Sequence, residues 1–561
     1  MENHSKNGER KPGCFENLAD ISNIYKAFLG SAFLSMPYGF RISGVILGIA
    51  GLLLCSSLMS FNGCLLVRCK REVVRRIMSE YSTTLPEDSS MYASRKEYLE
   101  SNLKFTDIGR FCFGKIGFYL AEIFLCLIQF CFCVSYIIVI AVNFSSLVCT
   151  PTNPITNSCT DCHAKSPALP PGQYTAGFQE SHRNLSSLAI THKDIVVTGT
   201  VNLTSSGVSD DEATTDPSVV LQIPLEGRFR RLIENSSDSV TPTGEESQRK
   251  FTYTSPCFFL LFVPIPIFMA LSIVRKVRYI GPISGVSLTF GMSIVVCLLG
   301  YFIVNFRVHS DVVFIHWSRF PVYLGQALGA LEGIGTMITI ESSMVGNRHR
   351  FLPFFLFVII TYTLIIGAVG LLGYFVFGDD TQEIITSNLT ADSGLAVFVK
   401  VAVCLSIGLT YPLQLVPVIE GLERSLFAPG RLCGPNVDDY AETIPFSESA
   451  TETLVSQDQR CMAIPQSVAT WKRNVARAAL VLFTLCVALM FIHHYAHLIA
   501  FAGALSGTAI GLVFPAAFHL KLMKDDMSLV ALLGYSFVIA IGLVLGITTT
   551  VTVVTEMVLA V

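Results

Sequence analysis

Long apolar runs separated by shorter polar segments dominate the chain. About 20 consecutive apolar residues, coiled as a helix, span the hydrocarbon core of a bilayer, and eleven runs approach or exceed that length. They cover residues 21–41, 45–67, 116–148, 257–274, 280–306, 323–344, 352–377, 395–419, 475–492, 498–521 and 529–561. The pattern predicts an all-α, polytopic membrane protein of about eleven transmembrane helices.

Three polar segments interrupt this rhythm. Residues 72–109 are rich in charge, residues 150–249 in Ser, Thr, Pro and Gly, and residues 422–467 in Ser, Thr and acids, a composition typical of disorder. The expected organisation is therefore a cytoplasmic tail (residues 1–20), three transmembrane helices (21–148), an insert (149–256), five transmembrane helices (257–420), a cytoplasmic loop (421–474) and three transmembrane helices (475–561).

Basic residues gather in alternate loops, as expected on the cytoplasmic side of a membrane. They occur at 68–76, 275–278, 348–350, 472–477 and 521–524, whereas the loop at 379–392 is acidic. The bias predicts a cytoplasmic N-terminus, an extracellular or lumenal insert and, for an odd number of spans, a C-terminus on the insert's side.

Composition agrees with a membrane protein. Hydrophobic residues make up 51% of the chain and charged residues 14%, against about 25% charged in soluble domains, and the mean hydropathy is +0.56. A net charge of −3 carries no signal for nucleic acid, so the lipid bilayer is the expected environment. Residues 1–12 lack the apolar core of a signal peptide, so the first helix is expected to insert and stay.

The insert carries signs of an oxidising compartment. Glycosylation sequons begin at Asn184, Asn202, Asn235 and, in the acidic loop, Asn388. Four cysteines lie at or within the insert, namely Cys149, Cys159, Cys162 and Cys257. Cys159 and Cys162 have the spacing of a metal or redox pair, but without a second pair at zinc spacing we favour disulfides of open connectivity and no metal site.

No catalytic constellation is present in the sequence. A nucleophile elbow, a Walker loop and His/Glu sets at metal spacing are all missing. These absences argue against an enzyme, a cofactor and a nucleotide-driven pump, and they leave gradient-driven transport as the class to test.

Small residues in two spans predict broken helices. Unwinding frees N–H groups for a carboxylate and C=O groups for an ammonium or a coupling ion. The first span offers Gly30-Ser31-Ala32, and the sixth offers Gly325, Gly329, Gly333 and Gly335. The alternative is close helix packing, which we favour for the tenth-span glycines Gly503, Gly507 and Gly511.

Glu332 is the most informative single residue, because an ionisable group inside a span indicates function by default. It can contact a substrate ammonium, titrate with a coupled proton, or pin the unwound helix through hydrogen bonds. Lys26 is its candidate partner, unless that side chain extends to the membrane surface.

Other polar groups carry weaker signals. The third span carries three polar residues at intervals of seven, namely Glu122, Gln129 and Tyr136. In the eighth span Tyr411 precedes a proline, which frees a backbone carbonyl. His493, His494 and His497 suggest a pH sensor, but they fall at a predicted boundary where we expect them to be solvated.

Five stretches together resemble one family. They are Lys26-Ala-Phe-Leu-Gly-Ser-Ala-Phe-Leu-Ser-Met-Pro37, Gln129-Phe-Cys-Phe-Cys-Val-Ser-Tyr136, Ala330-Leu-Glu-Gly-Ile-Gly335, Leu372-Gly-Tyr-Phe-Val-Phe-Gly378 and Leu409-Thr-Tyr-Pro-Leu-Gln414. On these motifs the chain resembles the amino acid/auxin permease family, most closely its proton-coupled amino acid transporter branch.

The resemblance implies a LeuT-like 5+5 inverted repeat, small neutral amino acids as substrates and a proton as the coupling ion. It also implies a substrate site and an ion-coupling set. The substrate site would comprise Phe28, Gly30, Ser31, Ala32, Tyr136, Glu332, Gly333 and Gly335, and the ion-coupling set Asn23, Glu332 and Tyr411.

The chain departs from that branch at three points. Ala27-Phe28 replaces a Gly-Asn pair, and Asn23 replaces a histidine linked to proton coupling, where the sodium-coupled branch has asparagine. The branch's disulfide would use Cys149, but residues 379–392 contain no cysteine, so pairing within the insert is the alternative. Sodium-coupled or uncoupled transport, and an amino-acid sensor, therefore remain open, as do the plasma membrane and the lysosomal or vacuolar membrane.

Overall fold

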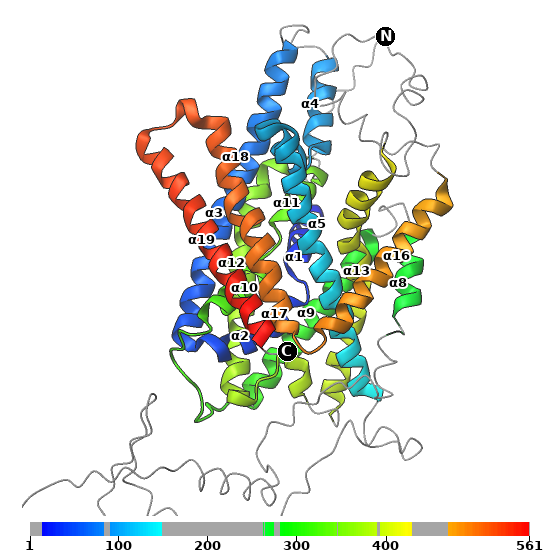
Figure 1. Cartoon of the computed structure of the whole chain (residues 1–561), viewed down its shortest axis with the longest axis vertical. Coiled ribbons are helices and arrows are strands. Elements are labelled where there is room, and N and C mark those ends of the chain that lie inside the picture. The colour runs from blue at the N-terminus through cyan, green and yellow to red at the C-terminus, as the bar shows by residue number, and fades with distance from the viewer. Residues whose placement is uncertain are drawn as a thin grey trace, which may run out of the picture. The chain divides into compact units, whose positions relative to one another are not determined.

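A computed structural model describes residues 14–82, 90–148, 262, 264–273, 281–344, 346–389, 393–428 and 469–559. The ordered elements within these ranges are helices, and no strand occurs among them. All of them belong to one packing unit, which Figure 1 shows as a bundle of long helices.

Within the described residues, eight helical segments are each long and apolar enough to cross a membrane. They are α3 (Val45–Ser82), α5 (Phe105–Val148), α9 (Gly281–Val304), α12 (Phe351–Phe377), α13 (Gly394–Phe427), α16 (Thr470–Phe491), the run from α17 (Tyr495–Ala502) to α18 (Phe514–Met523), and α19 (Leu529–Leu559). The predicted all-α, polytopic membrane class is confirmed.

Three further expected spans appear as shorter pieces. The first is α1 (Cys14–Phe28), the 3₁₀ turn η1 (Ala32–Ser35) and α2 (Met36–Ser43); the sixth is α10 (Phe320–Ala330) and α11 (Ile334–Ser343). The described part of the fourth is α8 (Ile265–Ile273). Short 3₁₀ turns complete the list: η5 (Arg348–Arg350), η6 (Gly378–Asp380), η7 (Ile385–Asn388) and η10 (Lys524–Asp526).

The charged segment 72–109 is largely helical, which its polarity alone did not indicate. Helix α3 continues to Ser82, α4 covers Ser90–Asn102, and α5 begins at Phe105. Glu72 forms ion pairs with Arg75 and Arg76, three and four residues further along α3. Such pairs lie on one helix face and stabilise a helix beyond its apolar part.

The tenth span widens into π-helix. After α17 the chain forms η8 (Gly503–Gly507) and η9 (Ala509–Val513), both π-helical, before α18. A Cβ atom on Gly503 would lie 2.0 Å from the Gly325 carbonyl oxygen and 2.3 Å from the Gly329 nitrogen. The close packing predicted for the tenth span is present at Gly503. It also explains why Gly325 and Gly329, which lie inside α10, are glycines, since a side chain at either position would meet the tenth span.

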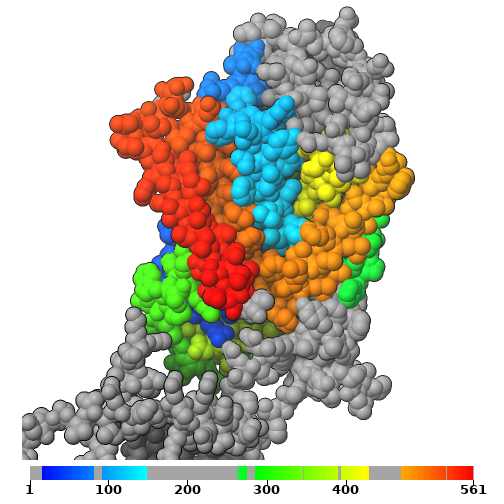
Figure 2. All heavy atoms as spheres, viewed as in Figure 1, coloured from blue at the N-terminus to red at the C-terminus, as the bar shows by residue number. Residues whose placement is uncertain are grey.

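The broken helices lie at the centre of the bundle. Helix α10 packs against α2, α3, α17 and α19, and α12 packs against α2, while α13 packs against α5 and α9. Figure 2 shows α19 in red, α5 in cyan and α16 in orange on one face. Helix α19 exposes apolar side chains along its length, including Phe537 and Ile547, as expected of a helix in contact with lipid.

Candidate functional site

The first broken helix opens at residues 29–31. Helix α1 ends at Phe28 and η1 begins at Ala32, so the three residues between them are not helical. The Gly30 N–H donates to the Phe28 carbonyl at 2.9 Å, two residues back instead of four. The break predicted at Gly30-Ser31-Ala32 is present, and it leaves the first N–H groups of a new helical segment without intrahelical partners.

The second broken helix opens at residues 331–333, between α10 and α11. Oε1 of the Glu332 carboxylate accepts a hydrogen bond from the Gly335 N–H at 2.9 Å, and so pins the first turn of α11. Its other oxygen, Oε2, is buried without a hydrogen-bond partner among the described residues. The carboxylate therefore has the structural role foreseen for it and keeps one free acceptor.

The two breaks contact each other. A Cβ atom on Gly333 would lie 2.8 Å from the nearest atom of the Phe28 ring, so a larger residue at position 333 requires that ring to move. The Phe28 ring also packs against Tyr362 of α12, with 5.9 Å between the ring centroids. Phe28 and Gly333 thus form the junction at which the end of α1 meets the start of α11.

Two buried tyrosines from other helices hold the broken ends, and sequence reasoning missed both. The Tyr495 hydroxyl of α17 donates to the Ser31 carbonyl at 2.9 Å, and the Tyr362 hydroxyl donates to the Ala330 carbonyl at 3.2 Å. Each bond satisfies a carbonyl that unwinding would otherwise leave buried without a donor. A tyrosine in an apolar run gives no sequence signal for such a role.

Helix α5 closes the first break from the side. The Ser31 hydroxyl lies 2.9 Å from the Ser135 hydroxyl, and a Cβ atom on Gly30 would lie 3.2 Å from the Tyr136 hydroxyl oxygen. Gln414 of α13 donates to that same tyrosine oxygen at 3.4 Å. The structure therefore brings Tyr136 to the Gly30 break, where the resemblance had placed it.

Lys26 has partners other than the one expected. Its ammonium donates to the Ser287 hydroxyl of α9 and to the Thr410 hydroxyl of α13, and these two hydroxyls lie 2.8 Å apart. Among the described residues Lys26 forms no ion pair, so the expected Lys26–Glu332 pair is not formed. A cation one turn before the break is held by neutral oxygens alone.

The other two residues of the expected ion-coupling set lie away from the breaks. Asn23 is an exposed residue of α1. Tyr411 is buried, bonds the Thr484 hydroxyl of α16 at 2.9 Å and stacks on Phe268 of α8, with 4.0 Å between the ring centroids. Tyr411 therefore joins three helices.

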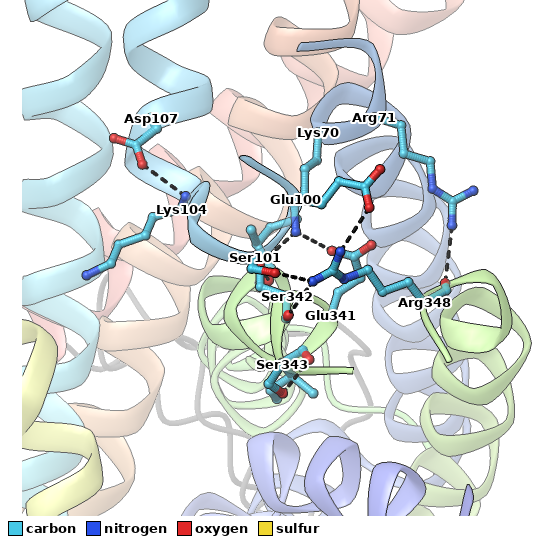
Figure 3. A network of polar contacts seen from close by, with 12 residues as sticks. Lys70, Arg71, Glu100, Ser101, Lys104, Asp107, Glu341, Ser342, Ser343 and Arg348 are labelled. Carbon is cyan, nitrogen blue, oxygen red and sulfur yellow. Dashed lines mark hydrogen bonds and ion pairs between the residues drawn. The ribbon is translucent and has the colours of Figure 1, made fainter. Parts of the chain in front are cut away.

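Polar contacts close the end of the bundle where α4 lies, which is the predicted cytoplasmic end. Figure 3 shows Lys70 of α3 paired with Glu341 of α11, and both side chains are almost completely buried. Lys70 also donates to the Ser342 hydroxyl at 2.7 Å. Beside them Arg348 pairs with Glu100 of α4 at 2.9 Å and donates to the Ser342 carbonyl at 3.0 Å.

The same end holds the start of α1. The Asn347 amide donates to the Asn17 side-chain oxygen at 2.9 Å and to the Asp20 carboxylate at 2.8 Å. The first turns of α1 are thereby linked to the segment between α11 and α12, next to Arg348. Both broken helices have their α4-side halves fixed by hydrogen bonds and ion pairs.

One glycosylation candidate lies among the described residues. The Asn388 amide nitrogen donates to the Asp380 carbonyl at 2.8 Å, and its oxygen accepts from the Gln382 N–H at 2.9 Å, so both ends of the amide are engaged within the loop. The remaining glycosylation and disulfide candidates lie outside the described residues: Asn184, Asn202, Asn235, Cys149, Cys159, Cys162 and Cys257.

Comparison with known proteins agrees with these features. The chain matches the family described as transmembrane amino acid transporter protein over residues 18–160 and 237–555. It is 23% identical to amino acid transporter AVT3C of Arabidopsis thaliana over 532 residues, which are 94% of this chain and 88% of that protein.

Shorter matches come from fungi and vertebrates. Vacuolar amino acid transporter 4 of Saccharomyces cerevisiae is 22% identical over 47% of this chain and 36% of its own length. The vesicular inhibitory amino acid transporter of Xenopus laevis is 28% identical over 37% of this chain and 35% of its own length. Because the family match covers most of the sequence, the chain belongs to the transmembrane amino acid transporter family and is a transporter, not an enzyme.

Proposed function

We propose that this protein is a secondary active transporter that moves small neutral amino acids together with a proton by alternating access. The observation that carries the proposal is the junction of two broken helices beside a buried carboxylate with one free oxygen. Membership of the family already implies that the protein transports amino acids. We propose in addition the class of amino acid, the coupling to a proton and the alternating-access mechanism.

The site supports a zwitterionic substrate. Of the three residues predicted to hold the substrate carboxylate, Gly30 already donates its N–H to Phe28. The unwound N–H groups of Ser31 and Ala32 suit that carboxylate, because helix starts carry partial positive charge. The free oxygen of Glu332 suits the substrate ammonium. One cationic and one anionic subsite match an amino acid whose side chain is uncharged.

The packing around the breaks favours a small substrate side chain. The Tyr136 hydroxyl lies against Gly30, and the Phe28 ring lies against Gly333. Both aromatic groups occupy space that a bulky side chain would need. We therefore expect glycine, alanine and serine to be preferred over leucine.

The surroundings of Lys26 favour a proton as the coupling ion. A charged amine inside a span costs several kcal/mol unless a counter-charge accompanies it, and the described partners of Lys26 are the neutral hydroxyls of Ser287 and Thr410. Lys26 and Glu332 are thus better placed than Asn23 and Tyr411 to exchange a proton beside the substrate.

Alternating access requires the α4 end to open. The Lys70–Glu341 pair and the Arg348 contacts would separate when substrate leaves on that side. Breaks in the first and sixth spans are the matched positions that a 5+5 inverted repeat would have, and we include that repeat in the proposal. The names of the vacuolar and vesicular relatives support an organelle membrane, with the N-terminus cytoplasmic and the insert lumenal.

Uptake by the purified full chain in proteoliposomes tests the proposal. Labelled glycine, alanine, serine, leucine, glutamate and lysine are offered under an imposed proton gradient, with and without sodium, and with a protonophore. We expect accumulation of the first three that needs the proton gradient and ignores sodium. A sodium requirement would overturn proton coupling, and saturable binding without uptake would favour a sensor.

Two pairs of variants locate the site. Gly30→Val should lower uptake by at least about ten-fold, because the added side chain meets Tyr136, whereas Gly300→Val on α9, where nothing lies within 4 Å of the added Cβ, should not. Lys26→Met should abolish proton-driven accumulation while leaving exchange of labelled for unlabelled substrate, and the exposed Lys115→Met of α5 serves as its control. Normal accumulation by Lys26→Met would exclude Lys26 as the proton site.

A further inference from the structure

A histidine lies between two carboxylates at the end of the bundle opposite α4. Nε2 of His497, in the first turn of α17, lies 3.2 Å from Oε2 of Glu556 on α19. Its Nδ1 lies 4.0 Å from Oε1 of Glu383, in the loop between α12 and α13. That nitrogen is buried without a hydrogen-bond partner among the described residues.

The arrangement is short of one proton. A neutral imidazole carries a single N–H, so it can donate to Glu556 or to Glu383 but not to both. On the remaining side a nitrogen lone pair faces a carboxylate oxygen, and neither atom supplies a hydrogen. A proton added to the imidazole lets Nδ1 donate a charge-assisted hydrogen bond to the Glu383 carboxylate when the 4.0 Å gap closes. A proton added to Glu383 instead lets the carboxyl O–H donate to Nδ1.

The same residues connect to both broken helices. Oε2 of Glu383 accepts a hydrogen bond from the Ala496 N–H at 2.9 Å, at the start of α17. Next to Ala496, Tyr495 donates its hydroxyl to the Ser31 carbonyl in the first break. Arg319, the residue before α10, lies 3.8 Å from Glu556.

Other charged and titratable groups surround His497. His494 and His493 lie in the turn between α16 and α17, and the ring of His494 lies 5.9 Å from that of His497. Tyr38 of α2 lies within electrostatic reach of Glu383, Glu556 and Arg41, and Arg41 in turn lies 4.0 Å from Asp379. The cluster therefore contains both signs of charge.

We propose that Glu383, His497 and Glu556 form a proton-binding latch on the predicted lumenal side. Uptake of one proton joins the α12–α13 loop to α17 and α19, and so fixes the closed arrangement of both broken helices at this end. A fall in lumenal pH closes the latch and a rise releases it. This regulatory site is separate from the coupling proton proposed at Lys26, and only its effect on transport depends on the proposed function.

The electrostatics of the loop suit such a site. Burial raises the pKa of the Glu383 carboxyl to about 7, although hydrogen bonds from the Ala496 and Tyr495 N–H groups oppose the rise. The side chain keeps 26% of its surface exposed, so protons reach it from that side. Burial and the neighbouring histidines lower the pKa of His494.

Hydrogen–deuterium exchange of the purified full chain tests the latch without any transport. After correction for intrinsic rates, amides of residues 381–389 and 495–499 should exchange about ten-fold more slowly at pH 5.5 than at pH 7.5. This is the order expected for one charge-assisted hydrogen bond. Amides of α11, at the far end, should change little.

Two substitutions should act in opposite directions. In Glu383→Gln the side-chain amide donates to Nδ1 permanently, so exchange should be slow at both pH values. In His497→Ala no side chain bridges the two carboxylates, so exchange should be fast at both pH values, and Glu556→Gln should weaken the pH effect. The controls are His349→Gln on η5 and Glu97→Gln on α4, both exposed, and each should retain the wild-type response.

A wild-type pH response in His497→Ala, or none in the wild-type protein, would overturn the latch. Substrate exchange at equal pH on both sides of the membrane gives the second measurement. In the wild type the exchange rate should be at least about three-fold lower at pH 5.5 than at pH 7.5, because the same hydrogen bond must break. In Glu383→Gln the exchange rate should be low at both pH values. An intact deuterium response in a protein that moves no amino acid would refute the proposed function and leave the latch standing.

Discussion

The buried ion pair between Lys70 and Glu341 offers the sharpest test of how this bundle is held together. Lys70 and Glu341 expose only 2% and 5% of their side chains, and the ammonium also donates to the Ser342 hydroxyl. Replacing Lys70 with Met leaves a carboxylate in the interior with no counter-charge. That loss is far more costly than the loss of an equivalent pair in water.

The expected magnitude follows from this burial. Removing one partner of a buried pair typically destabilises a protein by about 3–5 kcal/mol, whereas an exposed pair contributes about 0–1 kcal/mol. The chain contains both kinds. Lys104 and Glu420 form a pair whose side chains are 53% and 46% exposed, so Lys104→Met is a matched control within the same protein.

Thermal unfolding of the purified chain in detergent is the assay. Lys70→Met should lower the melting temperature by about 5 °C, and Lys104→Met should hardly change it. In the double variant Lys70→Met/Glu341→Gln the unpaired charge is gone, so at least half of the lost stability should return. This recovery is the coupling that a double-mutant cycle measures.

Two results would refute the reasoning. If Lys70→Met and Lys104→Met destabilise the protein equally, burial does not set the value of the pair. If the double variant loses the sum of the two single effects, Lys70 and Glu341 do not interact, and closure of the α4 end must depend on the Arg348 contacts instead.

Three further predictions concern the junction, the outer loop and the surface. Gly333→Ala should lower uptake about ten-fold because its methyl group meets the Phe28 ring. Adding Phe28→Ala should restore part of the uptake rate, and a double variant that transports no faster than Gly333→Ala would contradict the contact. Because burial raises the pKa of Glu383 from 4.5 to about 7, its contribution to stability is complete below pH about 4.5 and is lost as the pH rises through about 7. The melting temperature should therefore fall between pH 4.5 and pH 8, and Glu383→Gln should make it less dependent on pH. Asn388→Gln should leave the glycosidase-induced mobility shift unchanged, because its amide nitrogen already donates to Asp380; loss of the shift would show that Asn388 is the modified residue.

Much of the architecture could be predicted from the sequence because the bilayer restricts what a chain can do. An apolar run must form a helix there, since no water satisfies its backbone groups. Gly30-Ser31-Ala32 and the Glu332-Gly333 region were identified as breaks because small residues allow a helix to unwind and because a charge inside a span is rare unless it serves a function. Both breaks are present in the structure.

The polar segments were harder to interpret. The charge of residues 72–109 gave no sign of a helix, yet α3 continues into this segment as far as Ser82. Ion pairs three and four residues apart stabilise this part of the helix. The histidines at 493–497 were expected to be solvated. His497 instead lies between carboxylates from two other elements, which no local pattern announces.

The sequence by itself determined the class of protein and the positions of the breaks, since each depends on residues close together in the chain. Only the tertiary structure decided which groups meet. Lys26 reaches Thr410, 384 residues away, and Tyr495 reaches Ser31, 464 residues away. Such pairs depend on how the helices pack, and the packing is set by the combined fit of many apolar side chains, each of which gives the same sequence signal as its neighbours.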